Sequence, residues 1–462
     1  MEIFCGIDWA ERHHDVAVVD QAGTLLVRRR ITDDLAGFTA LSAMLAEHGG
    51  EQFTAVDVAI ETDRGLLVAA LRAAGHRVFA INPKAVDRYR DRHSVSGAKS
   101  DPGDALVLAH LLRTDRDQHR PMPDDSELGQ AVSVLARAHQ DLIWARRQDA
   151  NRLRSLLREF FPAALTAFTD LTTKTALTVL ATAPTPTAAA LLTRANLVDL
   201  LHAAGRGTRP AEAAHLTETF TAEELRQPAA VETAMGEAVR AIVRTLTATN
   251  ESIRQLEHAL AASFEQHPDA EIIDSLPGLG LVLGARVLGE FGDDPTRFTH
   301  AASRRNYAGT APITRASGRH RAVLARYIRN KRLADACYLW AFAALTRSTG
   351  ARSYYDRRRS AGDRHNAALR RPTPSRQQTP RPTPPLPDHP RALQRSPRLA
   401  RTGHRLTTNS RGVSSGDVVD HTANNVVGTL PTFESAKRTR LRSGSAVGPQ
   451  RAGRSFPHLT TD

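Results

Sequence analysis

Apolar and polar residues follow a strand-like pattern over much of the first 115 residues. Residues 2–8 alternate as a strand does, and residues 15–19 and 24–31 are strand-like runs joined by a short hairpin connection. Residues 54–61 and 76–81 are further short strands. The intervening and following segments have helical signals, over residues 33–47, 64–74 and 101–113. Three antiparallel strands followed by alternating helix and strand is the ribonuclease-H order, so the pattern predicts an α/β domain of that type.

The middle of the chain has a helical period instead. Apolar residues recur at alternating spacings of three and four, which is typical of a helix seam. This pattern fits two helices packed within one chain as well as it fits a coiled coil between chains. Between the two runs, the pattern does not define the helices of the Ala/Thr-rich residues 163–230. The seam positions are Leu128, Val132, Leu135, His139, Leu142, Arg146, Asp149, Leu153, Leu156 and Phe160 in the first run, and Met235, Val239, Ile242, Leu246, Thr249, Ile253, Leu256 and Leu260 in the second.

Composition changes sharply near residue 370. Residues 371–390 hold eight prolines, and the rest of the tail is rich in Arg, Ser, Thr and Gly with little periodicity, so we predict disorder. The sequence therefore predicts an α/β plus α protein of four segments. These are a ribonuclease-H-like domain over 1–118, a helical, coiled-coil-like linker over 119–268, a mostly helical domain over 269–369 and a disordered tail over 370–462.

Bulk composition excludes several classes of protein. Of 462 residues, 41% are hydrophobic and 24% charged, which permits a packed core. The two cysteines exclude a disulfide scaffold. No apolar run approaches the ~20 residues that span a bilayer, and the N-terminus lacks the features of a signal peptide, so we expect a soluble cytoplasmic protein without a membrane partner.

Basic residues are concentrated in two places. The tail from residue 371 holds 15 Lys and Arg against 5 Asp and Glu, so it carries +10 of the net charge of +13. Within the body, residues 297–359 hold 15 basic and 2 acidic residues. A dense arginine segment beside an otherwise acidic body indicates contact with nucleic acid.

Four carboxylates are candidates for a metal site. Asp8 lies on the first strand, Glu61 closes the fourth, and Asp101 and Asp104 share one face of a helix. In a ribonuclease-H-like sheet these positions converge, and Mg²⁺ is the natural counter-ion, with two ions able to clamp a phosphodiester. Each residue also has a structural explanation. Asp101 and Asp104 make a good helix start, Asp8 ends a strand, and Glu61 suits a solvated loop.

Two segments of the third domain are candidates for phosphate contact. The turn at residues 275–280 is glycine-rich and precedes an apolar helix, so it suits either a phosphate or an ordinary turn. Ser317 precedes a glycine among arginines, as either a covalent nucleophile or a residue that only hydrogen-bonds the DNA or RNA backbone. The basic residues expected to contact nucleic acid are Arg315, Arg319, Arg321, Arg326, Arg329, Lys331 and Arg332.

Seven short motifs occur along the chain in a characteristic order. They are Gly6-Ile7-Asp8-Trp9-Ala10, Ala59-Ile60-Glu61-Thr62, Asn82-Pro83, Lys99-Ser100-Asp101-Pro102-Gly103-Asp104-Ala105, Leu276-Pro277-Gly278-Leu279-Gly280, Tyr307-Ala308-Gly309-Thr310-Ala311-Pro312 and Ser317-Gly318. Through them residues 1–368 resemble the DEDD-type insertion-sequence transposases, a family that includes the Piv-like DNA invertases and the RNA-guided bridge recombinases.

The resemblance implies specific roles. Asp8, Glu61, Asp101 and Asp104 become the Mg²⁺-binding tetrad of a RuvC-like domain, and Ser317 the nucleophile that links covalently to cleaved DNA. It also implies a homo-oligomer, dimer or tetramer, in which tetrad and serine come from different subunits. The implied partners are donor DNA, target DNA and a structured non-coding RNA. The protein is expected in the cytoplasm, associated with the nucleoid. A metal-dependent RuvC-type nuclease and a nucleic-acid-binding remnant of a mobile element are the alternatives.

The sequence departs from the family pattern near residue 370. In the family, the helix that begins near residue 365 continues as an apolar segment, whereas here it turns into Arg370-Arg371-Pro372-Thr373-Pro374. We interpret residues 371–462 as the product of a reading-frame shift, which would leave this copy without its closing helix. Sequencing of the coding DNA tests this hypothesis, because another frame must then restore an apolar helix.

Overall fold

A computed structural model of the chain describes residues 2–49, 55–93, 101–207, 209–318 and 320–369. The predicted disordered tail and frame shift therefore lie outside the described residues. The chain divides into two compact units, Met1–Asp124 and Asp125–Asp462, which we describe separately. The finer boundaries expected at residues 118, 268 and 369 stay predictions. No described helix is long and apolar enough to cross a membrane.

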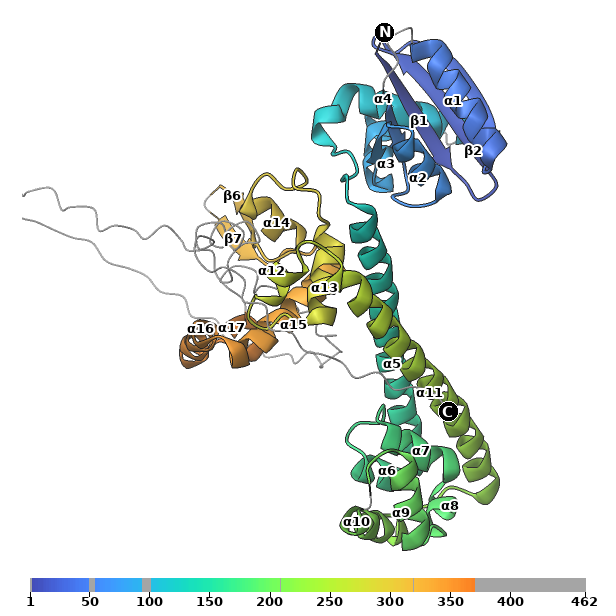
Figure 1. Cartoon of the computed structure of the whole chain (residues 1–462), viewed down its shortest axis with the longest axis vertical. Coiled ribbons are helices and arrows are strands. Elements are labelled where there is room, and N and C mark those ends of the chain that lie inside the picture. The colour runs from blue at the N-terminus through green and yellow to red at the C-terminus, as the bar shows by residue number, and fades with distance from the viewer. Residues whose placement is uncertain (1, 50–54, 94–100, 208, 319, 370–462) are drawn as a thin grey trace, which may run out of the picture. The chain divides into compact units, whose positions relative to one another are not determined.

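The first unit is a mixed sheet with helices on both faces (Figure 1). The sheet order is β3-β2-β1-β4-β5, with β1 to β3 antiparallel and β4 and β5 parallel to β1. This is the predicted ribonuclease-H order. The strands are β1 (Ile3–Trp9), β2 (His13–Asp20), β3 (Leu25–Thr32), β4 (Asp57–Ile60) and β5 (Arg77–Ala80), and the helices are α1 (Leu35–Gly49), α2 (Leu66–Ala73), α3 (Pro83–His93), α4 (Asp101–Asp115) and the short η1 (Arg116–Gln118).

Alternation along β1 divides the core of this unit between the two faces of the sheet. Ile3, Cys5 and Ile7 join the apolar cluster beneath α1 and α2, whereas Phe4 joins the cluster beneath α3 and α4. Burial raises the pKa of the Cys5 thiol to about 12, so this cysteine is an inert core residue.

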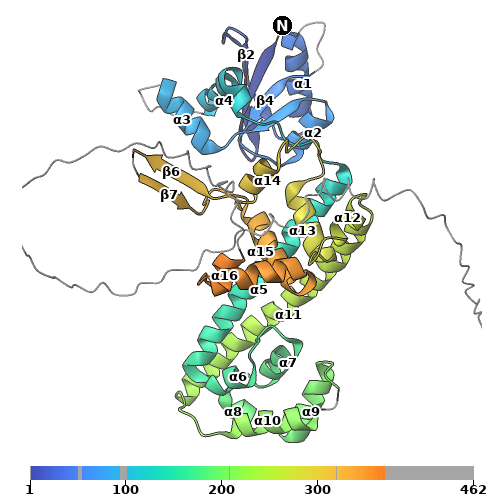
Figure 2. The same cartoon turned by 90° about the vertical axis from the view of Figure 1, so that its left-hand side faces the viewer.

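The second unit is built on two long helices, α5 (Glu127–Phe160) and α11 (Ala229–Glu265) (Figures 1 and 2). They run antiparallel, because His139 bonds to Glu257 at 3.1 Å while Arg146, further along α5, bonds to Asn250 at 3.2 Å. The two heptad seams therefore pack against each other within one chain. The structure thus agrees with the intramolecular interpretation of the pattern.

The Ala/Thr-rich stretch folds into a group of short helices at one end of this pair (Figure 2). Several of its threonines are helix N-caps: Thr173, Thr185 and Thr193 each accept a hydrogen bond from a backbone N–H three residues on. Because a new helix begins at each of these caps, no helix here is long enough to show a repeating hydrophobic pattern in the sequence. They are α6 (Pro162–Ala167), α7 (Lys174–Thr182), α8 (Pro186–Ala190), α9 (Arg194–Ala203) and α10 (Pro210–Thr221).

The other end of the pair carries the C-terminal elements around a core that includes Leu276, Leu288 and Trp340. The glycine turn packs against α15 there: a Cβ on Gly278, whose φ is +85°, would lie 2.6 Å from the amide nitrogen of Ala344. Gly278 is therefore needed for this turn to pack against α15. The elements are α12 (Ala270–Asp274), α13 (Leu281–Phe291), α14 (Ala301–Tyr307), β6 (Ile313–Ser317), β7 (His320–Leu324), α15 (Lys331–Arg347), α16 (Thr349–Ser360) and α17 (His365–Ala368).

Candidate active site

Two of the predicted carboxylates lie at one edge of the sheet in the first unit. Asp8 is near the end of β1, and Glu61 directly follows β4. Ile7 pairs with Ile60 in the parallel ladder, so Asp8 and Glu61 occupy the next position on two neighbouring strands. Both side chains are half-buried. The backbone register therefore brings this pair to the same edge, as the sequence predicts.

Gly6 sets how closely helix α4 approaches β1. A Cβ at this position would lie 2.1 Å from the carbonyl oxygen of Ala105 and 2.4 Å from the amide nitrogen of Ala109. Only glycine permits that contact. Residues two apart on a strand point to the same face, so Asp8 lies on the face that α4 covers, beyond the point of contact. Asp104 immediately precedes Ala105 and is brought towards the same part of that face.

Asp104 is buried and paired with an arginine that the sequence analysis did not single out. Its Oδ1 accepts a hydrogen bond from Arg90 Nη2 at 2.6 Å, and Arg90 is itself largely buried on α3. Arg90 also contacts Asp87 at 3.2 Å. No local pattern marks this pair, since 14 residues separate its members. The ion pair holds the Asp104 carboxylate in a fixed place.

A fifth carboxylate lies beside Asp8. Asp15 is opposite Asp8 in the β1–β2 ladder and is buried. Arg30 of β3 binds Asp15 through two hydrogen bonds, of 3.2 and 2.7 Å. This bidentate pair offsets one negative charge next to the predicted metal site.

The fourth member of the predicted tetrad, Asp101, is the first residue of α4, and its side chain lies outside the described part of the chain. Within that described part, no three His, Cys, Asp or Glu side chains form a group able to hold a metal. The donor chemistry nevertheless fits, because carboxylate oxygens are the ligands that Mg²⁺ prefers. The tetrad and its metal therefore stay predictions.

Ser317 lies in the second unit, at the tip of a two-stranded hairpin formed by β6 and β7. It pairs with His320 across the turn, where Gly318 has a φ of +54°. All residues of both strands are exposed except the half-buried Ile313. Arg315 and Arg321 on these strands are exposed too, while Arg319 lies outside the described residues. The serine is accessible. By strand register Arg315 shares its face of the hairpin, whereas Arg321 lies opposite Ala316 on the other face.

The other predicted basic contacts have partners inside the unit. Arg326 donates to the carbonyl oxygen of Ala311 at 3.3 Å. Arg329 donates to the carbonyl oxygen of Arg326 at 2.7 Å. Arg332 pairs with Asp141 at 2.7 Å and its guanidinium lies over the Trp144 ring. These arginines position the hairpin and α15, while Lys331 at the start of α15 is exposed.

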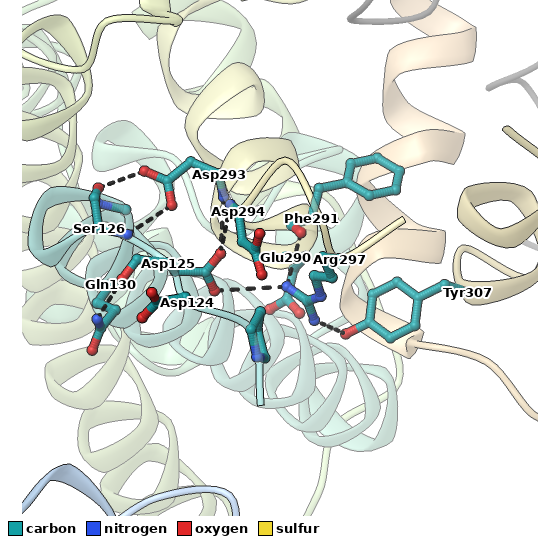
Figure 3. A network of polar contacts seen from close by, with 12 residues as sticks. Asp124, Asp125, Ser126, Gln130, Glu290, Phe291, Asp293, Asp294, Arg297 and Tyr307 are labelled. Atoms are coloured by element: carbon teal, nitrogen blue, oxygen red, sulfur yellow. Dashed lines mark hydrogen bonds and ion pairs between the residues drawn. The ribbon is translucent and has the colours of Figure 1, made fainter. Parts of the chain in front are cut away.

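A polar network fastens the turn after α13 to the start of α5 (Figure 3). The Asp293 carboxylate accepts hydrogen bonds from the amide and hydroxyl of Ser126, and Asp125 accepts from the Asp293 amide at 3.0 Å. Burial alone would raise the pKa of Asp293, but Ser126 and His267 lower it below its usual value. The carboxylate is therefore charged and well suited to holding this turn.

The same network extends towards the helix that precedes the serine hairpin. Arg297 donates to the carbonyl oxygen of Phe291 at 2.8 Å and to the Tyr307 hydroxyl at 3.2 Å (Figure 3). Asn330 donates to the same hydroxyl at 2.9 Å and caps α15. The sequence analysis singled out Tyr307 only as part of a motif and missed its contacts with Arg297 and Asn330, which lie 10 and 23 residues away from it.

Two transposase family models match the chain. The first, a DEDD transposase, covers residues 5–162, and the second, "Transposase IS116/IS110/IS902 family", covers residues 270–356. The chain is also 56% identical over 376 residues to the mini-circle transposase for IS117 of Streptomyces coelicolor, covering 80% of this chain and 91% of that protein. The chain belongs to the IS110 family of DEDD-type transposases. The resemblance seen in its motifs is thereby confirmed, and the protein is a DNA transposase.

More distant relatives extend over the same share of this transposase. The 44.8 kDa protein of insertion element IS116 of Streptomyces clavuligerus is 32% identical over 371 residues, 79% of this chain and 90% of that protein. The 43.6 kDa protein of insertion element IS110 of S. coelicolor is 30% identical over 374 residues, 80% and 90% of the two chains. Among solved structures, T. thermophilus RuvC in complex with Holliday junction substrate matches 26% of this chain and all of its own, at 19% identity and a TM-score of 0.20.

Proposed function

We propose that this transposase cleaves and rejoins DNA with a magnesium site on the first unit and a covalent serine on the second. The observation that carries the proposal is the contact between α4 and Gly6, because it brings Asp104 towards the face of β1 that holds Asp8. Glu61 adjoins Asp8 by strand register, and Asp101 begins the same helix as Asp104. These four carboxylates would hold Mg²⁺, which supplies charge stabilisation for phosphate oxygens when bound.

Ser317 supplies the nucleophile in this proposal. Its Oγ attacks phosphorus, an Oγ–P bond forms, and the P–O bond to the departing sugar oxygen breaks. The serine proton passes to solvent, and the departing oxygen takes a proton in turn. Arg315 and Arg321 lie on the same exposed hairpin, where guanidinium groups bind phosphate oxygens and offset developing charge.

The partners in this proposal are donor DNA, target DNA and a structured non-coding RNA. Base pairing with the RNA would choose the DNA sequence, while arginines bind backbone phosphates and set affinity. A homo-oligomer, dimer or tetramer, would bring a tetrad and a serine from different subunits together. Because the α5–α11 seam is filled within one chain, other surfaces must form that oligomer.

A covalent protein–DNA adduct tests the chemistry. The full chain is incubated with Mg²⁺, donor and target DNA, and RNA transcribed from the flanking non-coding sequence, and adducts that resist denaturant are counted. We expect Ser317→Ala and Asp8→Asn to abolish the adduct. Thr314→Ala, on the opposite face of the hairpin, and Asp20→Asn, at the other end of the sheet, are the matched controls.

The other outcomes separate the remaining functions. Cleavage without an adduct identifies a metal-dependent nuclease in which Ser317 only contacts phosphate. An adduct that forms equally well without RNA removes the guide from the proposal. If no reaction occurs even when an apolar C-terminal helix replaces the tail, the copy is a DNA-binding remnant and the catalytic proposal is wrong.

A further inference from the structure

Trp9 is a large aromatic residue exposed beside the predicted metal site. It ends β1, directly after Asp8, and 46% of its surface is exposed. Neighbouring strand residues point to opposite faces, so Asp8 and Trp9 leave the same strand end in different directions. An exposed indole offers an apolar face and a ring N–H to a ligand.

The indole is held in place from beneath. Trp9 pairs with His14 in the β1–β2 ladder, and their rings lie stacked with centroids 6.4 Å apart and planes 25° apart. His14 is fully buried, its Nε2 lies 3.1 Å from Asp33, and its Nδ1 faces the Ala10 amide at 3.4 Å. One face of the indole therefore rests on an anchored ring, and its orientation is fixed before any ligand arrives.

Two exposed arginines lie at the same sheet edge. Arg12 is in the turn that follows β1, and Arg64 is in the loop that follows Glu61, where it forms a solvent-exposed contact of 3.5 Å with Asp63. Because β1 and β4 are parallel neighbours, both segments leave the same edge of the sheet. An oriented aromatic ring flanked by arginines is the arrangement that binds single-stranded nucleic acid, through base stacking and backbone charge.

We propose that Trp9 stacks on an unpaired base of single-stranded DNA bound at this edge. The part of this inference that puts the base next to the reacting phosphate rests on the proposed function, because it requires Asp8 to hold the metal there. The stacking itself does not, since it needs only the indole, its His14 support and the two arginines. Stacking is tolerant of base identity, so Trp9 would position the strand without reading its sequence.

Binding measured without cleavage tests this role. The full chain is titrated with a short fluorescein-labelled single-stranded oligonucleotide in EDTA, and anisotropy gives the affinity. We expect Trp9→Ala and Trp9→Leu to weaken binding by about 5- to 100-fold, and Trp9→Phe to lose far less. Trp144→Phe removes the partly exposed tryptophan of the second unit and is the matched control, with no change expected.

Tryptophan emission gives a second readout that a merely structural role would not change. In the Trp144→Phe background only Trp9 and the buried Trp340 emit, so DNA should quench the Trp9 share of the fluorescence. The absence of quenching, or wild-type affinity in Trp9→Leu, would overturn the proposal, because leucine keeps an apolar contact with His14 but cannot stack on a base. Thermal unfolding of each variant excludes misfolding as the cause of weak binding.

Failure of this inference is distinguishable from failure of the proposed function. If no adduct forms but Trp9→Leu still loses single-strand affinity, Trp9 binds DNA and the recombination chemistry is wrong. If the adduct forms normally and the Trp9 variants bind as the wild type does, only the stacking role is wrong.

Discussion

The two halves of the proposed chemistry are built in contrasting ways. The carboxylates lie on a five-stranded sheet covered by helices, where Gly6 lets α4 touch the backbone of β1 and Arg90 fixes Asp104. Ser317 lies on an isolated two-stranded hairpin that is exposed along nearly its whole length. A two-stranded hairpin is marginally stable by itself, whereas a packed sheet is rigid. We therefore expect the proposed metal half to be preorganised and the geometry of the proposed nucleophile half to be completed by DNA.

This contrast predicts different costs of substitution. Changes near the carboxylates should lower the free energy of unfolding, because the site and the core share side chains. Changes on the hairpin should remove activity and leave stability unchanged. The following variants test that division, from the largest expected effect on stability to the smallest.

Gly6→Val should destabilise the first unit most. Its branched side chain would have to displace the α4 backbone at Ala105 and Ala109, and we expect a loss of more than about 5 kcal/mol. Urea unfolding followed by circular dichroism measures the loss. Ala80→Val, an exposed change on the edge strand β5, is the control and should be close to neutral. Equal stability of Gly6→Val and wild type would show that the α4–β1 contact is not tight.

Arg90→Met should have the next largest effect. It removes a buried partner of the Asp104 carboxylate, a change that typically costs about 3–5 kcal/mol for a buried ion pair. The same urea experiment measures it, with Arg88→Met on the exposed face of α3 as control. A loss no greater than that of Arg88→Met would mean that Arg90 does not hold Asp104.

Acidification should weaken the first unit through His76. Burial lowers the pKa of His76 below its ordinary value of 6.5, and its Nδ1 accepts a hydrogen bond from the Val56 amide at 3.3 Å. The folded state thus prefers the neutral ring. The neutral His76 ring therefore stabilises the folded state above pH 6.5, and this stabilisation is lost as the pH falls below 6.5.

Thermal unfolding at a series of pH values checks this expectation. His76→Asn keeps an acceptor but does not titrate, so its melting temperature should fall less than that of the wild type on acidification. Because burial also lowers the pKa of His119, the comparison is made between variant and wild type at each pH. Parallel pH profiles would exclude His76 as a source of acid sensitivity.

Ser317→Ala should have the smallest effect on stability and a complete effect on the adduct. The side chain is exposed at the hairpin tip, so we expect a change within about 0.5 kcal/mol. Urea unfolding and the adduct assay on the same preparation measure both quantities. A substantial loss of stability would mean that the hairpin is packed in solution and that the contrast between the two halves is wrong.

The sequence by itself determined the order of strands and helices and most of the candidate residues. Alternation along the chain predicts β1 to β3, and at the start of α1 the Asp34 side chain accepts a hydrogen bond from the Gly37 amide three residues on. The period of three and four gave α5 and α11. These signals are local, because periodicity and capping depend on residues within a few positions of one another.

Only the tertiary structure decided which elements meet. The heptad seams are compatible with either a partner chain or the same chain, and packing within the chain selected the latter through contacts such as His139 with Glu257. The Arg90–Asp104 pair, the stack of Trp9 on His14 and the network around Asp293 likewise join residues brought together by folding. Such pairs leave no local trace, since what stabilises them is burial that exists only once distant elements have packed.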